Sequence, residues 1–74
     1  MKVAILSPKR VLFDGEAKSV FLTGDIAEFE LLDHHAPIIS LLRPGTVTLD
    51  WENRIPIRRG IVRYDNNECV ILTE

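Results

Sequence analysis

Asp33, His34 and His35 are the residues whose types and spacing most suggest chemistry, because carboxylate and imidazole groups bind metal ions and transfer protons. A catalytic zinc site needs three converging protein ligands, and neighbouring side chains of an extended segment point to opposite sides. No further histidine is present to complete such a site. We therefore expect a turn that leads into Pro37, with no metal and no other cofactor. A small enzyme that uses these three residues is kept as an alternative.

Nucleophilic catalysis and nucleotide binding are not indicated elsewhere in the chain. Ser7, Ser19 and Ser40 lack the flanking glycines of a nucleophile elbow. Cys69 precedes the apolar run Val70–Leu72, where a cysteine is usually a small buried hydrophobe. The four glycines are isolated and precede no helical pattern, so they form no phosphate-binding loop. We expect no catalytic residue and no nucleotide site.

Charged residues are segregated along the chain, which has 9 Lys and Arg against 11 Asp and Glu, a net charge of −2. An early stretch is acidic through Asp25, Glu28, Glu30 and Asp33. A later stretch is basic and aromatic through Arg54, Arg58, Arg59, Arg63, Trp51 and Tyr64. The later set is similar to a base-stacking and phosphate-binding surface, so a small oligonucleotide-binding β-barrel is the alternative function. The negative net charge favours a solvated face instead, and we expect no nucleic-acid partner.

Glycine and proline divide the 74 residues into short segments, which is typical of an all-β sandwich or barrel. A chain of this length forms one domain, residues 1–74. Strict alternation of apolar and polar residues in 46–51 and 54–58 predicts half-buried strands. No run approaches the roughly 20 apolar residues of a membrane span, so no direct membrane insertion is expected.

Turns are predicted where residues that tolerate or require unusual backbone angles separate these strands. Asp14-Gly15 predicts a tight hairpin, and Pro44-Gly45 predicts a type II turn with positive φ at the glycine. Asp65-Asn66-Asn67 predicts a second hairpin and 51–54 a third. The stretch 25–32 is compatible with both a capped helix and a strand, and alternation favours the strand, with Phe29 and Leu31 on one face.

An ordered set of short motifs runs through the sequence. In chain order they are I-L-S-P at 5–8, L-F-D-G-E at 12–16, V-F-L-T-G at 20–24, E-F at 28–29, H-A-P-I-I-S at 35–40, R-P-G at 43–45, G-I-V at 60–62, N-N at 66–67 and V-I-L at 70–72. Each motif is weak alone. Their order and spacing over essentially the whole chain resemble the epsilon subunit of bacterial and chloroplast F-type ATP synthases.

The resemblance implies a flattened antiparallel β-sandwich of short strands. It also implies a non-catalytic rotor subunit of a proton-translocating synthase, at the cytoplasmic face of the bacterial inner membrane. One face would pack on the gamma subunit, and one end would rest on the polar loops of the membrane rotor ring. The family positions that contact the ring match Glu28 and His35, which are expected at the same end of the domain. The residues expected to contact the gamma subunit are Ile38, Leu42, Ile61 and Val62.

The sequence departs from the family pattern at three glycine positions and in length. Ala27, His34 and Arg59 stand where the family usually has glycine, so we expect altered turns before Glu28 and at residue 34. The family usually continues into two C-terminal helices that brake ATP hydrolysis and in some cases bind ATP. Because the sequence ends at Glu74, we expect this chain to lack the inhibitory helical region and not to bind ATP.

Overall fold

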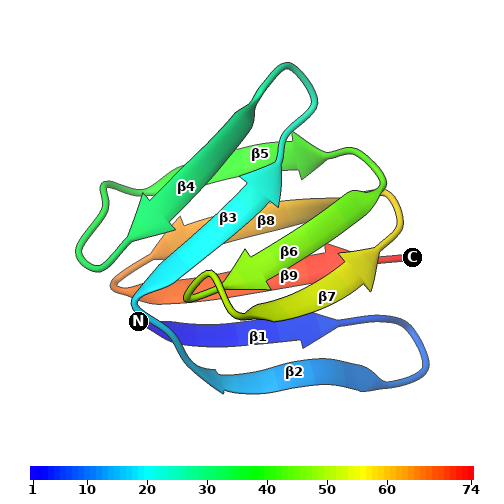
Figure 1. The fold of residues 1–74 in the computed structure, drawn as a ribbon, viewed down its shortest axis with the longest axis horizontal. Helices are drawn as coiled ribbons and strands as arrows, with labels where there is room; N and C mark the ends of the chain where they lie inside the picture. Colours follow the sequence, from blue (N-terminus) through cyan, green and yellow to red (C-terminus); the bar gives the residue numbers. More distant parts are fainter.

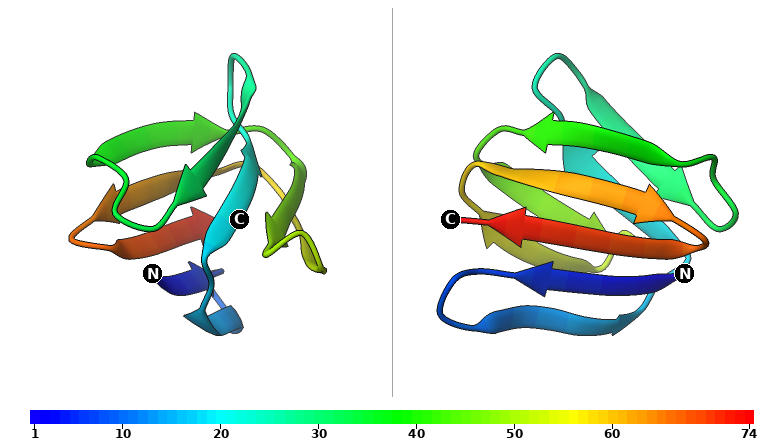
Figure 2. Two further views of the ribbon diagram at one scale, coloured as in Figure 1. Left: turned by 60° about the vertical axis from the view of Figure 1, so that its left-hand side comes forward. Right: turned by 180° about the vertical axis from the view of Figure 1, so that it is seen from behind.

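Two β-sheets packed face to face make up the computed structural model, which describes residues 1–74 (Figures 1 and 2). The strands are β1 (Lys2–Leu6), β2 (Val11–Glu16), β3 (Ser19–Thr23), β4 (Glu28–Leu32), β5 (Ile38–Leu42), β6 (Gly45–Leu49), β7 (Asn53–Ile57), β8 (Gly60–Asp65) and β9 (Glu68–Thr73). The five-stranded sheet has the order β2-β1-β9-β8-β5, and the four-stranded sheet has the order β4-β3-β6-β7. All pairs are antiparallel except β1 with β9. The predicted all-β sandwich is confirmed.

The core fills the space between the sheets, because alternate residues of most strands are apolar and point inward. Its 14 buried members are Met1, Val3, Ile5, Ala17, Val20, Leu22, Leu31, Leu42, Val47, Leu49, Val62, Tyr64, Cys69 and Ile71. The prediction that Val47 and Leu49 face inward from a strand is confirmed, but burial does not alternate strictly, because Thr48 between them is also buried at 9% exposure. Trp51 does not continue this pattern, because it lies in the turn after β6 and is 59% exposed.

One corner of the sandwich joins the two sheets. Gly24, after β3, forms an isolated antiparallel bridge with Leu42 at the end of β5. The backbone N–H of Arg43 donates to the carbonyl of Thr23 at 3.1 Å, and its Nε donates to the carbonyl of Gly24 at 2.8 Å. A Cβ at position 24 would lie 2.6 Å from the carbonyl oxygen of Ala27, so this corner requires glycine. The β3–β4 and β5–β6 connections are therefore held as one unit.

The hairpin predicted at Asp14-Gly15 is wrong. β2 continues through both residues to Glu16, and Gly15 pairs with Val3 of β1. The Phe13 ring lies 3.1 Å from the place where a Gly15 Cβ would be, so the ring covers the glycine within the strand. The true β1–β2 turn lies at residues 7–10. Pairing with β1 thus overrides the local turn preference of Asp-Gly.

The other predicted turns have mixed outcomes. No glycine has a positive φ, so Pro44-Gly45 is not a type II turn, and Gly45 instead begins β6. The hairpin at 65–67 is confirmed, with φ of 49° at Asn66 and 57° at Asn67. The hairpin predicted at 51–54 lies at residues 50–52 instead.

The stretch 25–32 is a turn followed by a strand and contains no helix. β4 pairs along its whole length with β3, with Leu31 fully buried and Phe29 packed against the core. The strand interpretation is therefore confirmed for residues 28–32.

His34 adopts a φ of 63°, so a histidine takes the left-handed conformation that glycine occupies at lowest cost. Such a conformation costs a side-chain-bearing residue roughly 1–2 kcal/mol, and histidine is among the residues that adopt it more often. Ala27 and Arg59, the other two residues at family glycine positions, do not have positive φ. Among these three positions, residue 34 is therefore the one that needs compensating contacts.

Candidate interaction surfaces

The edge formed by β4 carries Glu28 and His35, the two residues expected to contact the rotor ring. Glu28 is the first residue of β4 and is exposed beside the turn at 25–27. The backbone N–H of His35 donates to the carbonyl of Leu32, the last residue of that strand, at 3.2 Å. β4 has five residues and rises roughly 3.3 Å per residue, so the length of this strand separates Glu28 from His35. The two residues therefore lie at opposite ends of β4, and their expected placement at the same end is wrong. β4 itself is the edge strand of the four-stranded sheet (Figure 1).

The corner at residues 33–35 is anchored to the rest of the domain by hydrogen bonds. The Met1 amino group donates to Asp33 and, at 2.8 Å, to the carbonyl of Ala17. The side-chain oxygen of Asn67 accepts from the His34 N–H at 3.0 Å and from the Tyr64 hydroxyl at 2.7 Å. These bonds offset the backbone cost of the left-handed His34.

His35 is positioned by the same corner and by an aromatic neighbour. Its ring meets the Tyr64 ring edge-on, with centroids 5.9 Å apart and an interplanar angle of 85°. Its Nδ1 lies 2.6 Å from the carbonyl oxygen of Ala36. His34, His35 and Asp33 thus have separate partners, and the structure gathers no group of three or more metal-ligating side chains.

Asp33 makes the stability of this corner depend on pH. The hydrogen bond from the Met1 ammonium holds the pKa of the Asp33 carboxyl below its ordinary value of 3.8. A carboxyl with a lowered folded-state pKa contributes stability above its unfolded pKa, and that contribution disappears as pH falls through the folded value. We expect the unfolding free energy to fall as the pH drops below the ordinary carboxyl pKa of 3.8, and part of this fall to be absent in Asp33→Asn.

Urea denaturation at a series of pH values measures this effect. Asp25→Asn is the matched control, because Asp25 is exposed and its carboxylate has no ion-pair partner. A pH dependence in Asp33→Asn equal to that of the control would contradict the prediction.

The outer surface of the five-stranded sheet is unusually apolar, and we call it the apolar face. Its outward-pointing apolar residues are Ala4, Leu6, Ile39, Leu41, Ile61, Val70 and Leu72. Strand register places Leu6 beside Leu72, Leu72 beside Ile61 and Ile61 beside Leu41, which makes one continuous row across four strands. Antiparallel sheets commonly present a polar outer surface to water, so an apolar one indicates a covered surface.

Three of the four residues expected to contact the gamma subunit point away from this surface. Leu42 is 2% exposed and Val62 is fully buried, because both point into the core between the sheets. Ile38 also points inward and packs against the core, whereas Ile61 lies on the apolar face. The exposed neighbours of the buried residues are Leu41, at 60%, and Ile39, at 67%.

Ile39 and Leu41 of β5 were not among the residues expected to contact the gamma subunit, although the sequence of β5 indicates an apolar outer side. β5 is apolar at four of its five positions, I-I-S-L-L, so it does not alternate like β6. A strand that is apolar on both sides is typical of a sheet buried on both faces.

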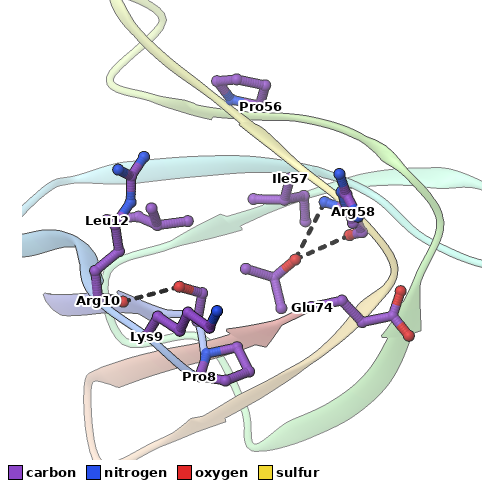
Figure 3. Close-up of a pocket in the computed structure, with 10 residues that line it drawn as sticks. Pro8, Lys9, Arg10, Leu12, Pro56, Ile57, Arg58 and Glu74 are labelled. Carbon is purple, nitrogen blue, oxygen red and sulfur yellow. Dashed lines mark hydrogen bonds between the residues drawn. The ribbon is translucent and has the colours of Figure 1, made fainter.

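An open depression of about 750 Å³ lies where the β1–β2 turn meets the ends of β7 and β9 (Figure 3). Lys9, Arg10 and Arg58 line it together with Glu74. Thr73 closes one wall, since its hydroxyl accepts from the Arg58 N–H at 3.1 Å and donates to the Arg58 carbonyl at 3.2 Å. The depression gathers cations but no pair of nucleophile and base, so its geometry does not resemble a catalytic site.

The residues of the nucleic-acid alternative are dispersed rather than brought together. Tyr64 is 1% exposed in the core, and Arg63 lies on the outer surface of the five-stranded sheet. Trp51 and Arg54 lie in the β6–β7 hairpin of the opposite sheet, where the Trp51 ring packs at 5.0 Å on Phe21. A stacking surface needs its aromatic and basic groups on one side, so this geometry argues against that alternative.

Cys69 is 1% exposed, and burial raises the pKa of its thiol to about 12. A thiol of this kind is not a nucleophile at neutral pH. It acts as a small core residue, as its apolar sequence surroundings predicted.

No helix of the structure could cross a membrane.

The fold is similar to that of chains in two solved structures, and the similarity covers nearly the whole chain. A chain in the cryo-EM structure of the central stalk and c-ring of the Tetrahymena thermophila mitochondrial ATP synthase superposes with a TM-score of 0.78 at 17% identity, over 97% of this chain and 61% of that one. A chain of the Euglena gracilis mitochondrial ATP synthase gives 0.81 at 16% identity, over 96% and 48%. These comparisons establish the shared fold.

Sequence comparison gives closer relatives. The ATP synthase epsilon chain of Sulfurimonas denitrificans is 35% identical over 100% of this chain and 60% of its own length. The ATP synthase epsilon chain 2 of Nitrobacter hamburgensis is 36% identical over 99% of this chain and 56% of its own length. The chain therefore spans somewhat more than half the length of these curated relatives. Residues 1–74 match the family described as ATP synthase, Delta/Epsilon chain, beta-sandwich domain, and the chain therefore belongs to this family.

Proposed function

We propose that this chain is a non-catalytic central-stalk component of a proton-translocating F-type ATP synthase. In this proposal it links the gamma subunit to the membrane rotor ring, at the cytoplasmic face of a bacterial inner membrane, and so couples proton flow to ATP synthesis. The observation that carries the proposal is the apolar face on a chain whose whole length matches the epsilon family. A free monomer would expose this surface to water, whereas a stalk subunit covers it.

The apolar face is the proposed contact with the gamma subunit. Its row Leu6–Leu72–Ile61–Leu41 crosses β1, β9, β8 and β5, so a single partner element laid across the strands touches all four. Interfaces of stable complexes have an apolar centre that excludes water and a polar rim. Here Lys2, Glu68 and Asp65 are neighbours at one end of the same strands and supply part of the rim.

The β4 edge is the proposed contact with the loops of the ring. It differs in chemistry from the apolar face, because Glu28 and His35 are both exposed and polar. The tight turn before Glu28 places Ile26, which is 95% exposed, at the tip of this edge. Separate polar contacts in water are weak, whereas the apolar face is suited to hold one partner firmly.

A compact two-layer body suits a mechanical part. Close-packed interiors have low compressibility and transmit strain. The bridge between Gly24 and Leu42 ties the proposed ring edge to the sheet that carries the apolar face. Force applied at β4 therefore reaches β5 through the backbone.

We expect Glu28→Lys to lower proton pumping in membranes that carry the mutant synthase. The substitution replaces the carboxylate with a cation against a ring loop that we propose to be basic, and like charges across an interface disfavour the contact. ATP-driven proton pumping measured by fluorescence quenching tests this directly. Glu16→Lys is the matched control, since Glu16 is exposed at the end of β2, which is the edge strand of the other sheet. Equal pumping by the two mutants would contradict the role of Glu28.

A further inference from the structure

We propose that the partner covering the apolar face presents a carboxylate to Arg63. This inference rests on the proposed function for the identity of that partner, the gamma subunit, and adds the chemistry of its contact surface. Arg63 lies in the middle of β8, exposed on the outer side of the five-stranded sheet. Its register partners are Ile39 on β5 and Val70 on β9, so it stands among apolar side chains.

The surface around Arg63 is shaped as well as apolar. A depression of about 430 Å³ lies on one side, lined by Pro37, Ile38, Ile39, Arg63, Tyr64 and Asp65. Another of about 290 Å³ lies on the other side, lined by Ile39, Ile61, Arg63, Val70 and Leu72. Arg63 borders both depressions. A partner that fills both depressions with apolar side chains therefore covers Arg63.

Arg63 has no counter-ion within the chain. The only ion pair within 4.0 Å joins Met1 and Asp33, on another part of the molecule. The acidic groups nearest in the strand register are Asp65 and Glu68, which face each other at the turn end of the β8–β9 hairpin. Neither lies within ion-pair distance of Arg63. The guanidinium is therefore solvated in the free chain.

Covering this face removes that solvation. A buried charge without a partner is strongly disfavoured, and a guanidinium group is matched best by a carboxylate that accepts two hydrogen bonds. A partner surface that is wholly apolar or basic over Arg63 would bind weakly. The apolar row gives the partner affinity, and Arg63 selects for an acidic residue within the partner's apolar stripe.

The test is the affinity of the chain for the gamma subunit of the same synthase, measured by titration with the unaltered chain and three variants. Arg63→Glu is expected to weaken binding by at least about tenfold, because it opposes like charges in a desolvated contact. Arg63→Met keeps length and apolar area, and is expected to bind less tightly and with less dependence on salt than the unaltered chain. Arg54→Glu is the matched control, because it makes the same charge change on the outer surface of the other sheet.

The outcomes separate the two proposals. If Arg63→Glu binds the gamma subunit as tightly as Arg54→Glu, the carboxylate contact is wrong while the proposed function stands. Restoration of tight binding to Arg63→Glu by an Asp-to-Arg or Glu-to-Arg change on the gamma subunit would support the contact. Failure of the unaltered chain to bind the gamma subunit would overturn the proposed function and this inference with it. Unfolding midpoints equal to that of the unaltered chain exclude misfolding as the cause of any loss.

Discussion

A glutamate in place of Leu41 is expected to reduce binding to the gamma subunit by about 100-fold or more, or roughly 2.7 kcal/mol. Leu41 is 60% exposed and ends the row of apolar side chains that crosses four strands. A carboxylate there would be buried against an apolar partner surface without a counter-ion. The fold is expected to persist, because the free chain already exposes this side chain to water. Co-purification with the gamma subunit and titration of the purified pair measure the effect.

Thr46→Glu is the control for this substitution. Thr46 is exposed on the outer side of the four-stranded sheet, which the proposal leaves free of the gamma subunit. The Thr46→Glu variant is expected to bind the gamma subunit as tightly as the unaltered chain does. Retention of binding by Leu41→Glu, or an equal loss in both mutants, would show that the apolar face is not the contact.

Leu42→Ala is expected to destabilise the fold by about 2–5 kcal/mol, whereas Leu41→Ala is expected to change stability by less than about 0.5 kcal/mol. Leu42 is 2% exposed within the core, so its truncation leaves a cavity. A domain of 74 residues has a total stability of roughly 4–11 kcal/mol, so this one change removes a large part of it. Urea or thermal denaturation measures both mutants.

The order of the two effects is expected to be opposite for binding to the gamma subunit. Leu41→Ala is expected to weaken the gamma contact, while the folded fraction of Leu42→Ala is expected to bind normally, because its side chain never reaches the surface. A small stability loss in Leu42→Ala, or a large one in Leu41→Ala, would mean that the inward and outward sides of β5 are assigned the wrong way round.

The two proposed contacts differ in their chemistry and therefore in the kind of attachment that they can provide. The apolar face is continuous and offers an attachment that persists, whereas the β4 edge presents separate polar groups at its two ends. Glu28 follows the turn that is tied to β5, and His35 follows the corner held by Met1 and Asn67. Each of the two residues proposed to contact the ring is therefore held by its own set of backbone contacts.

The amino-acid sequence by itself determines the fold class, one of the hairpins and the family. Short segments between glycines and prolines, together with period-two alternation in β6, predict an all-β domain. Asn66 and Asn67 predict the β8–β9 hairpin, because asparagine adopts the left-handed conformation at low cost. The ordered motifs, with H-A-P at 35–37 and R-P-G at 43–45, are sufficient to indicate the family.

The positions of the other turns, the buried side of β5 and the separation of Glu28 from His35 depend on pairing between strands that are distant in the sequence. Asp14-Gly15 looks like a turn locally, yet both residues are held extended by β1. β5 is apolar on both sides, so its sequence is the same whichever side faces inward, and only its pairing with β8 distinguishes Leu42 from Leu41. Glu28 and His35 are close in sequence, and the extended path of β4 puts its full length between them. A pattern of period two reports alternation, but partners distant in the chain choose which side is buried.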